Sequence, residues 1–343
     1  MEKTELIPLY VAPSFATAIP IIEVLWRYDA AGSRHYRRKN GEVFKSLTTF
    51  ISAVESTPVI LQGWREKLIE ELGSGDKVDT FVEATATYGT LDHEALAHIV
   101  REGQVDWLQL YEWAKRLLEG QDFSGQTSSL AATDLLNDIA CFLQWIHDYN
   151  VVILAVELPV WSQHGFATLI DLVAEKDEKK YESTPPEKRK RHKCIVNLKS
   201  GRKGFFDSHG LQLIGERMMF NQVYGPAFGN IDAIYNLAPT NWRTTPDYKF
   251  YDWTFRVTEK NNRLTKLFDN YIDRAKIEDI LGEPSTQFKK FEGITRVGES
   301  PVNQLFFRTY KQFVEDKSNF KQERNKTKKT TEEEIGSTIE KEK

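Results

Sequence analysis

Three short runs rich in Val, Ile and Leu, in the middle of the 343-residue chain, constrain its fold more than any other feature. The runs span residues 151–160, 167–174 and 193–198. Aliphatic and β-branched residues in runs of this length are typical of buried strands. We therefore expect three strands of one sheet, and each of them contains or ends at a polar residue, namely Glu157, Asp171 and Lys199.

These polar residues stand among apolar neighbours. A carboxylate buried between Ile and Leu costs several kcal/mol unless it is paired or binds a metal. Three such positions on consecutive strands indicate one shared site that contains Glu157, Asp171 and Lys199. The alternative interpretation is a separate, locally satisfied polar residue on each strand.

Apolar spacing of three and four residues predicts helices on both sides of these runs. The expected helices span 64–72, 77–100, 107–118, 130–147, 211–224, 262–281 and 303–314. Two further strands are expected at 230–237 and 248–257, and an extended segment at 44–51. The chain is therefore expected to have an α/β (α+β) fold, with a helical N-terminal region packed on a central mixed β-sheet.

The same pattern divides the chain into four parts. We expect a mostly helical region at 1–150, an α/β core at 151–258 and C-terminal helices at 259–316. The last part, 317–343, has 8 Lys/Arg and 6 Asp/Glu in 27 residues and one aromatic side chain, Phe320. Such a composition predicts a disordered charged tail.

Composition excludes several classes of protein. Hydrophobic residues make up 40% and charged residues 28% of the chain, as in a soluble globular protein. No apolar run approaches the roughly 18 residues that a membrane helix needs, and the N-terminus lacks the pattern of a secretory signal. Cys141 and Cys194 are the only cysteines, so we expect a reducing compartment and a cytoplasmic location.

Positive charge is concentrated in one segment of a chain whose net charge is −4. Between Glu187 and Lys203 there are eight basic residues and one acid. We expect 176–192 to form a mobile arm between the second and third strands, with Pro185 and Pro186 interrupting it. Such a patch attracts polyanions; the alternative is a solvated hairpin tip.

A histidine in the second expected helix is a further candidate. His93 follows Gly89 by one helical turn, and Gly inside a helix costs about 1 kcal/mol relative to Ala. A Gly retained there indicates close approach of another backbone segment. Most single helical histidines are surface or core residues, so His93 becomes a functional candidate only through its partners.

In their order along the chain, these pieces resemble the PD-(D/E)xK nuclease superfamily, and within it the RecB-type branch that includes phage exonucleases. That branch has Gly-Thr-x-x-His on a helix, an upstream Glu, Gly-x-x-x-x-(Ile/Leu)-Asp, (Asp/Glu)-x-Lys and a helix opening with Gln-x-x-x-Tyr. This chain offers Gly89–His93, Glu157, Gly165–Asp171, Asn197–Gly201 and His209–Gln212. The segments Phe44–Thr49 and Trp64–Arg65 resemble the region before the His helix.

The resemblance implies a sheet of restriction-endonuclease-like type and a metal-dependent DNA nuclease, most often an exonuclease. It implies Mg²⁺ or Mn²⁺ held by His93, Asp171 and position 197, with Lys199, Asp171 and Glu157 as catalytic residues. DNA, as single strands or duplex ends, is the implied partner, in a bacterial host or phage-infected cell. The expected DNA contacts are Gln212, Lys188, Arg189, Lys190, Arg191, Arg202 and Lys203.

Two positions depart from the family pattern. Asn197 stands where the second core acid is expected, and Glu216 stands in place of the tyrosine of Gln-x-x-x-Tyr. An Asn oxygen can coordinate a hard cation, but it carries no formal charge, so metal affinity is expected to be weaker. An acid at position 197 would lie two residues before Lys199 and is expected to strengthen metal binding. We expect Glu216 to pair with Arg217 or Lys203.

Three functions remain open from the sequence. The first is a metal-dependent nuclease, in which either Asn197 replaces an acid of an active parent or Glu157 supplies the missing charge. The second is a nuclease-fold protein that binds DNA without cutting it. The third is a scaffold that uses the fold without nucleic acid.

Overall fold

The computed structural model is described here for nine stretches of the chain. They are residues 19–30, 33–54, 59–102, 106–123, 126–180, 185–200, 204–242, 246–257 and 262–278. The expected helix at 303–314 and the expected tail at 317–343 lie outside these residues. Within the described stretches, no helix is both long and apolar enough to cross a bilayer.

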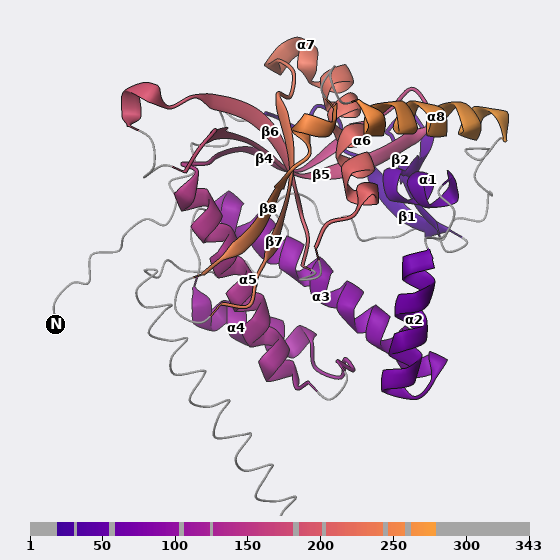
Figure 1. Ribbon diagram of the computed structural model, residues 1–343, viewed down its shortest axis with the longest axis vertical. Helices are drawn as coiled ribbons and strands as arrows, with labels where there is room; N and C mark the ends of the chain where they lie inside the picture. Colours follow the sequence, from indigo (N-terminus) through magenta and orange to yellow (C-terminus); the bar gives the residue numbers. More distant parts are fainter. Residues whose placement is uncertain are drawn as a thin grey trace, which may run out of the picture.

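One mixed sheet runs through the described part of the molecule (Figure 1). Its strands are β1 (Trp26–Ala30), β2 (Ser33–Arg37), β3 (Val43–Ser46), β4 (Val152–Trp161), β5 (Phe166–Asp177), β6 (Arg191–Leu198), β7 (Ala233–Pro239) and β8 (Tyr248–Asp252). Their order is β1-β2-β3-β5-β6-β7-β8, and β4 pairs with β5. The pairs β3–β5 and β6–β7 are parallel and the others antiparallel. The chain thus has the expected mixed α/β architecture.

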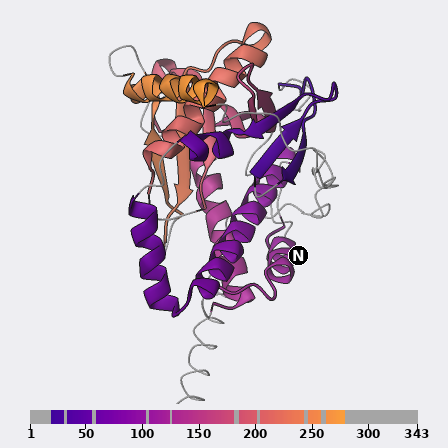
Figure 2. The same ribbon diagram turned by 90° about the vertical axis from the view of Figure 1, so that its right-hand side faces the viewer.

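Helices cover both faces of this sheet (Figures 1 and 2). They are α1 (Leu47–Val54), α2 (Val59–Leu72), α3 (Gly75–Glu102), α4 (Trp107–Leu117), α5 (Ser128–Asp148), α6 (Asp207–Val223), α7 (Gly225–Phe228) and α8 (Arg263–Ile277), with short 3₁₀ turns at Pro186–Lys188 and Thr254–Val257. One hydrophobic cluster joins α3, α4 and α5 to the sheet, and a second joins α1, α6 and α8 to the opposite face. The sheet is therefore the middle layer of three.

Two expected strands are shorter than predicted, for local reasons. Residues 47–51 are helical because the Ser46 hydroxyl accepts a hydrogen bond from the Thr49 N–H (3.0 Å) and starts α1. The last strand ends at Asp252, whose carboxylate accepts from the Thr254 N–H (2.8 Å) and begins a 3₁₀ turn.

The expected mobile arm at 176–192 is also shorter than predicted. Lys176 and Asp177 pair with His192 and Arg191 as the last rungs of the β5–β6 ladder. The Lys176 ammonium lies 4.2 Å from the centre of the Tyr149 ring, and its side chain is buried. The cation–π contact compensates the burial of the Lys176 charge. Lys176 can therefore stay inside the ladder, and both strands extend further than predicted.

Aromatic packing beneath α8 anchors the N-terminal end of β5. The Phe166 ring is fully buried, stacks on Phe50 at 4.7 Å and meets Phe268 edge-on at 6.0 Å. This cluster ties α1 and α8 to the strand that carries Asp171.

We expect Phe166→Ala to lower the free energy of unfolding by about 3–5 kcal/mol, because it removes a buried ring and leaves a cavity. Phe255→Ala is the matched control, since the Phe255 side chain is 66% exposed; it should change stability by less than about 0.5 kcal/mol. Urea unfolding followed by circular dichroism measures both. Equal losses for the two variants would contradict this account of the core.

Candidate metal centre

The central sheet divides at Asp171. Along one edge, β5 pairs with β4 over nearly its whole length. Along the other edge, Phe166 and Ala167 pair with β3, whereas the pairing with β6 begins only at Leu172. Asp171 therefore lies between the segment of β5 that pairs with β3 and the segment that pairs with β6. The ladder along this edge of β5 is interrupted at Asp171.

In both strands that carry the expected acids, the alternation of side chains between the two faces of the sheet is interrupted at Glu157 and Asp171. We call this interruption a phase change. In a regular strand, Ile170 and Leu172 would face the same side of the sheet. Here Ile170 and Leu158 belong to the hydrophobic cluster that joins α1, α6 and α8 to the sheet, whereas Leu172 and Val156 belong to the cluster on the opposite face. The pairs Val156↔Leu172 and Leu158↔Ile170 put Glu157 opposite Asp171.

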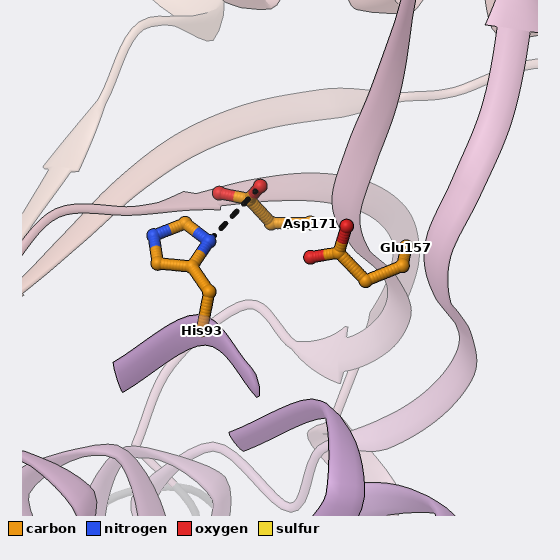
Figure 3. A group of neighbouring side chains, drawn as sticks. All are labelled: His93, Glu157 and Asp171. Carbon is orange, nitrogen blue, oxygen red and sulfur yellow. Dashed lines mark ion pairs between the residues drawn. The ribbon is translucent and has the colours of Figure 1, made fainter. Parts of the chain in front are cut away.

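Glu157 is the residue at which β4 changes phase. Its φ is +50°, in the left-handed region that non-glycine residues seldom occupy. Strain of this kind persists only where the surrounding structure imposes it, and it is concentrated at functional sites. It directs the Glu157 carboxylate toward Asp171 (Figure 3).

His93 reaches this pair of acids from α3 (Figure 3). Its Nδ1 lies 3.4 Å from Oδ1 of Asp171. One potential ligand atom from each of His93, Glu157 and Asp171 lies within 4.8 Å of the other two. Five residues were expected to converge, namely His93, Glu157, Asp171, Asn197 and Lys199, and the first three of them offer ligand atoms that lie close together.

The helix approaches the sheet closely here because position 89 is a glycine. A Cβ atom built on Gly89 would lie 3.2 Å from Oγ of Ser200, the residue after Lys199. The sequence indicated close approach of another backbone, but the group that a Cβ would meet is a side chain. This contact brings the His93 turn of α3 against the end of β6.

Charge coupling dominates the His93–Asp171 pair. Burial lowers the pKa of His93, but the carboxylates of Asp171, Glu157 and Asp92 together raise it by more, and the resulting pKa is about 9. Burial raises the pKa of Asp171, yet His93 and Lys199 lower it below its usual value. The metal-free centre therefore holds an imidazolium–carboxylate pair at neutral pH.

Hydrogen bonds hold Asp171 to the end of β6 and Lys199 to α6. Oδ2 of Asp171 accepts from the Leu198 N–H at 2.7 Å. Nζ of Lys199 donates to Oε1 of Gln212 at 3.1 Å, and Nε2 of Gln212 donates to Oε1 of Glu216 at 2.8 Å. Burial lowers the pKa of Lys199, partly opposed by Asp171 and Glu216. Gln212, expected to contact DNA, here holds Lys199.

Asn197 points its polar atoms toward α6 and β7. Its Nδ2 donates to Oε1 of Glu216 at 3.4 Å, and its Oδ1 accepts from Nδ2 of Asn236 at 3.3 Å. Oδ1 of Asn236 in turn accepts from Nε1 of Trp253 at 2.8 Å. The hydrogen bonds of the Asn197 side chain thus go to these neighbours, and its expected role as a metal ligand stays a prediction.

Glu216 is the residue of this site that the sequence reasoning missed. It was expected to pair with Arg217 or Lys203; within the described residues its hydrogen bonds are to Gln212 and Asn197, and Lys203 lies outside those residues. The Glu216 side chain is fully buried. Burial, and then Asp171, raises the pKa of Glu216 to about 8. The signal that could have identified it was an acid between the apolar stretches of α6.

The basic residues near the β5–β6 turn divide into two groups. Arg191 lies 3.2 Å and Arg189 3.9 Å from the buried Asp177 carboxylate, so both support the hairpin. Lys188 and Lys190 are exposed to solvent. The other two expected DNA contacts, Arg202 and Lys203, lie outside the described residues.

The donor set fits a divalent cation. Ligand atoms lie about 2.0–2.1 Å from Mg²⁺ and about 2.3–2.6 Å from Ca²⁺, so two ligands of one ion are at most about 4 Å apart for Mg²⁺ and about 5 Å apart for Ca²⁺. The three donor atoms lie within 4.8 Å of one another and satisfy the wider of these limits, and two carboxylates supply charged oxygens. The set itself does not distinguish Mg²⁺ from Mn²⁺.

The pKa values predict how stability depends on pH in the absence of metal. His93 has a folded-state pKa of about 9, above its ordinary value of 6.5, so its contribution is complete below about pH 6.5. That contribution should be lost as the pH rises through about 9. Thermal unfolding of wild type and His93→Gln in EDTA at pH 6, 7.5 and 9.5 measures it. A difference in Tm that does not shrink with rising pH would contradict the pairing.

Comparison with known proteins leaves the family open. No model of a known protein family matches the sequence, and a search of curated proteins finds no match. The likeness to nucleases therefore depends on the ordered motifs and on the centre described above.

Proposed function

We propose that this chain is a divalent-cation-dependent nuclease that hydrolyses phosphodiester bonds in DNA, of the RecB-type PD-(D/E)xK kind, and that it acts as an exonuclease. The observation that carries the proposal is the convergence of His93, Glu157 and Asp171 on one point where the sheet divides. The phase change in two strands and the strained φ of Glu157 support a functional centre. Strand irregularities and strained backbone are concentrated next to active sites.

Each residue has a role that follows from its chemistry. Asp171, Glu157 and His93 would hold the cation, which when bound would supply Lewis-acid stabilisation of the phosphate and acidify a water. Gln212 fixes the Lys199 amine beside Asp171. From there Lys199 can orient the attacking water or neutralise charge on the phosphate. Lys188 and Lys190 can contact the DNA backbone.

A protein that binds DNA without cutting it is the second candidate. Asn197 favours it, since this position lacks the charge expected beside Lys199. The two candidates make the same prediction for DNA binding and opposite predictions for cleavage.

The nuclease proposal is tested with labelled single-stranded and duplex DNA in Mg²⁺ or Mn²⁺. We expect wild type to cleave DNA and EDTA to stop it, and Asp171→Asn to lower the rate by about a hundredfold or more, because it removes a charged cation ligand. Asp269→Asn, at an exposed position on α8, is the matched control and should retain full activity. Absence of cleavage in wild type, with DNA binding intact, would favour the second candidate.

The proposed DNA contacts predict a specific salt dependence. Changing both Lys188 and Lys190 to Ala should weaken DNA binding and reduce the slope of log K against log salt by about two, since each phosphate contact contributes about one. Thermal stability should stay near that of wild type. Arg191→Ala should instead lower stability, because it leaves the buried Asp177 with one fewer partner. Fluorescence anisotropy at several salt concentrations measures the slope, and an unchanged slope would place DNA elsewhere.

A further inference from the structure

Aromatic rings form a continuous row at the start of α6. Trp253 is buried, and the centre of its ring lies 4.5 Å from that of Tyr251. The row continues from Tyr251 to Phe205 at 6.1 Å, from Phe205 to His209 at 6.3 Å, and from His209 to Phe206 at 5.5 Å. Phe206 is 48% exposed. The row therefore begins in the core and ends at the solvent.

The packing at both ends of this row fixes its position. Nε1 of Trp253 donates to Oδ1 of Asn236 at 2.8 Å. A Cβ atom built on Gly210 would lie 2.7 Å from Cε3 of Trp253, so the first turn of α6 lies directly on this ring. At the exposed end, Nδ1 of His209 accepts from the Phe206 N–H at 3.3 Å, which orients the imidazole. Rings held in place before a ligand arrives lower the entropy cost of binding it.

The exposed end of the row lies beside the proposed centre. His209 and Gln212 are three residues apart on α6, so their side chains are neighbours on one face of the helix. Gln212 holds the Lys199 amine. Burial, and then the Lys199 charge, lower the pKa of His209 to about 4, so its ring is neutral at neutral pH. Phe206 is thus within about two helical turns of the residue that positions Lys199.

Positive charge accompanies these rings. The Arg256 guanidinium lies 5.9 Å from the centre of the Tyr251 ring and 5.2 Å from that of Trp253. Its Nη1 is 2.8 Å from Oδ1 of Asp207. Lys249 is exposed and stands two residues before Tyr251 on β8, so both side chains leave the same face of the strand. Aromatic rings beside cationic side chains bind single-stranded nucleic acid, because every base has a π-face and every phosphate a negative charge.

The size of the exposed aromatic surface fits one base. Phe205, His209 and Tyr251 are half-buried, so the area open to solvent is little more than the Phe206 ring and its border. A stable contact with another protein needs an area of about 800 Å² on each partner. One nucleobase stacked on one ring needs no more than this surface offers.

We propose that Phe206 and His209 form a stacking site for one unpaired base of single-stranded DNA, beside the centre that would hold the cation. This inference rests on the proposed function and names its substrate as a single strand or a single-stranded end. The base lies on the Phe206 ring, and the strand continues toward Lys199 and the metal centre. Bases inside a duplex are stacked on one another and do not reach such a site unless they are flipped out.

Fluorescence anisotropy with a labelled thymidine oligonucleotide, in EDTA to prevent cleavage, measures the contribution of the ring. Phe206→Ala should weaken single-strand binding by about 5- to 100-fold, the usual effect of losing one stacked base. Phe206→Trp keeps a π-face and should bind within about threefold of wild type, whereas Phe206→Leu should behave like Phe206→Ala. Leu108→Ala on α4 is the matched control, because Leu108 is also 48% exposed, and it should leave affinity within about twofold of wild type.

Three further measurements separate stacking from other contacts. A strand that contains 2-aminopurine should lose fluorescence when saturated with wild type, because stacking quenches this base, and should keep it with Phe206→Ala. The slope of log K against log salt should be the same for both proteins, since a stacked ring releases no counterions. Tm and the binding of a blunt duplex should stay near those of wild type, because Phe206 is exposed and a blunt duplex offers no unpaired base.

The outcomes separate this inference from the proposed function. If wild type binds and cleaves single-stranded DNA and Phe206→Ala does so equally well, the stacking site is wrong and the nuclease proposal stands. If Phe206→Ala weakens binding of a blunt duplex as much as that of a single strand, the ring does not hold an unpaired base and the inference fails. If wild type neither binds nor cleaves DNA with Mg²⁺ or Mn²⁺, both proposals fail.

Discussion

The electrostatic coupling of Asp171 to His93 is the interaction on which the rest of the centre depends. An ionised carboxylate in the middle of a sheet is unfavourable unless charged or hydrogen-bonding groups surround it. Here His93 approaches from one helical layer, the Leu198 N–H lies on the neighbouring strand, and Lys199 adds a positive field. The pair thus joins α3 to β5 and β6, and a cation bound there would take over part of the role of the imidazolium.

The surrounding hydrophobic layers make this arrangement possible. Helices on both faces bury the sheet, so a local phase change at Glu157 and Asp171 costs little of the total apolar contact. The phase change nevertheless moves two carboxylates out of the regular inward and outward positions and toward each other. The positive φ of Glu157 lies in the row where the two acids meet, and a further irregularity of β4 lies between Ile153 and Ala155.

Much of the fold could be predicted from local patterns. The strands near 151–160 and 167–174 and the helices α2 to α5 are set by apolar spacing, and Gly73, with φ +87°, ends α2 where expected. The convergence of His93 with Asp171 was predictable only because an ordered set of motifs indicated it. The extent of β5 and β6 was not predictable, since a buried lysine compensated by aromatic rings from three separate segments leaves no local signal.

Glu216 shows why single positions are an incomplete guide to such a centre. In the sequence, Asn197 is an amide where the nuclease pattern has an acid, and Glu216 is an acid where that pattern has a tyrosine. The two residues are 19 positions apart, and only the packing of α6 on β6 brings them together. Both side chains are buried, and the hydrogen bond between them joins β6 to α6. A substitution at one of these positions therefore changes the hydrogen bonding of the other, and the two side chains have to be interpreted as a pair.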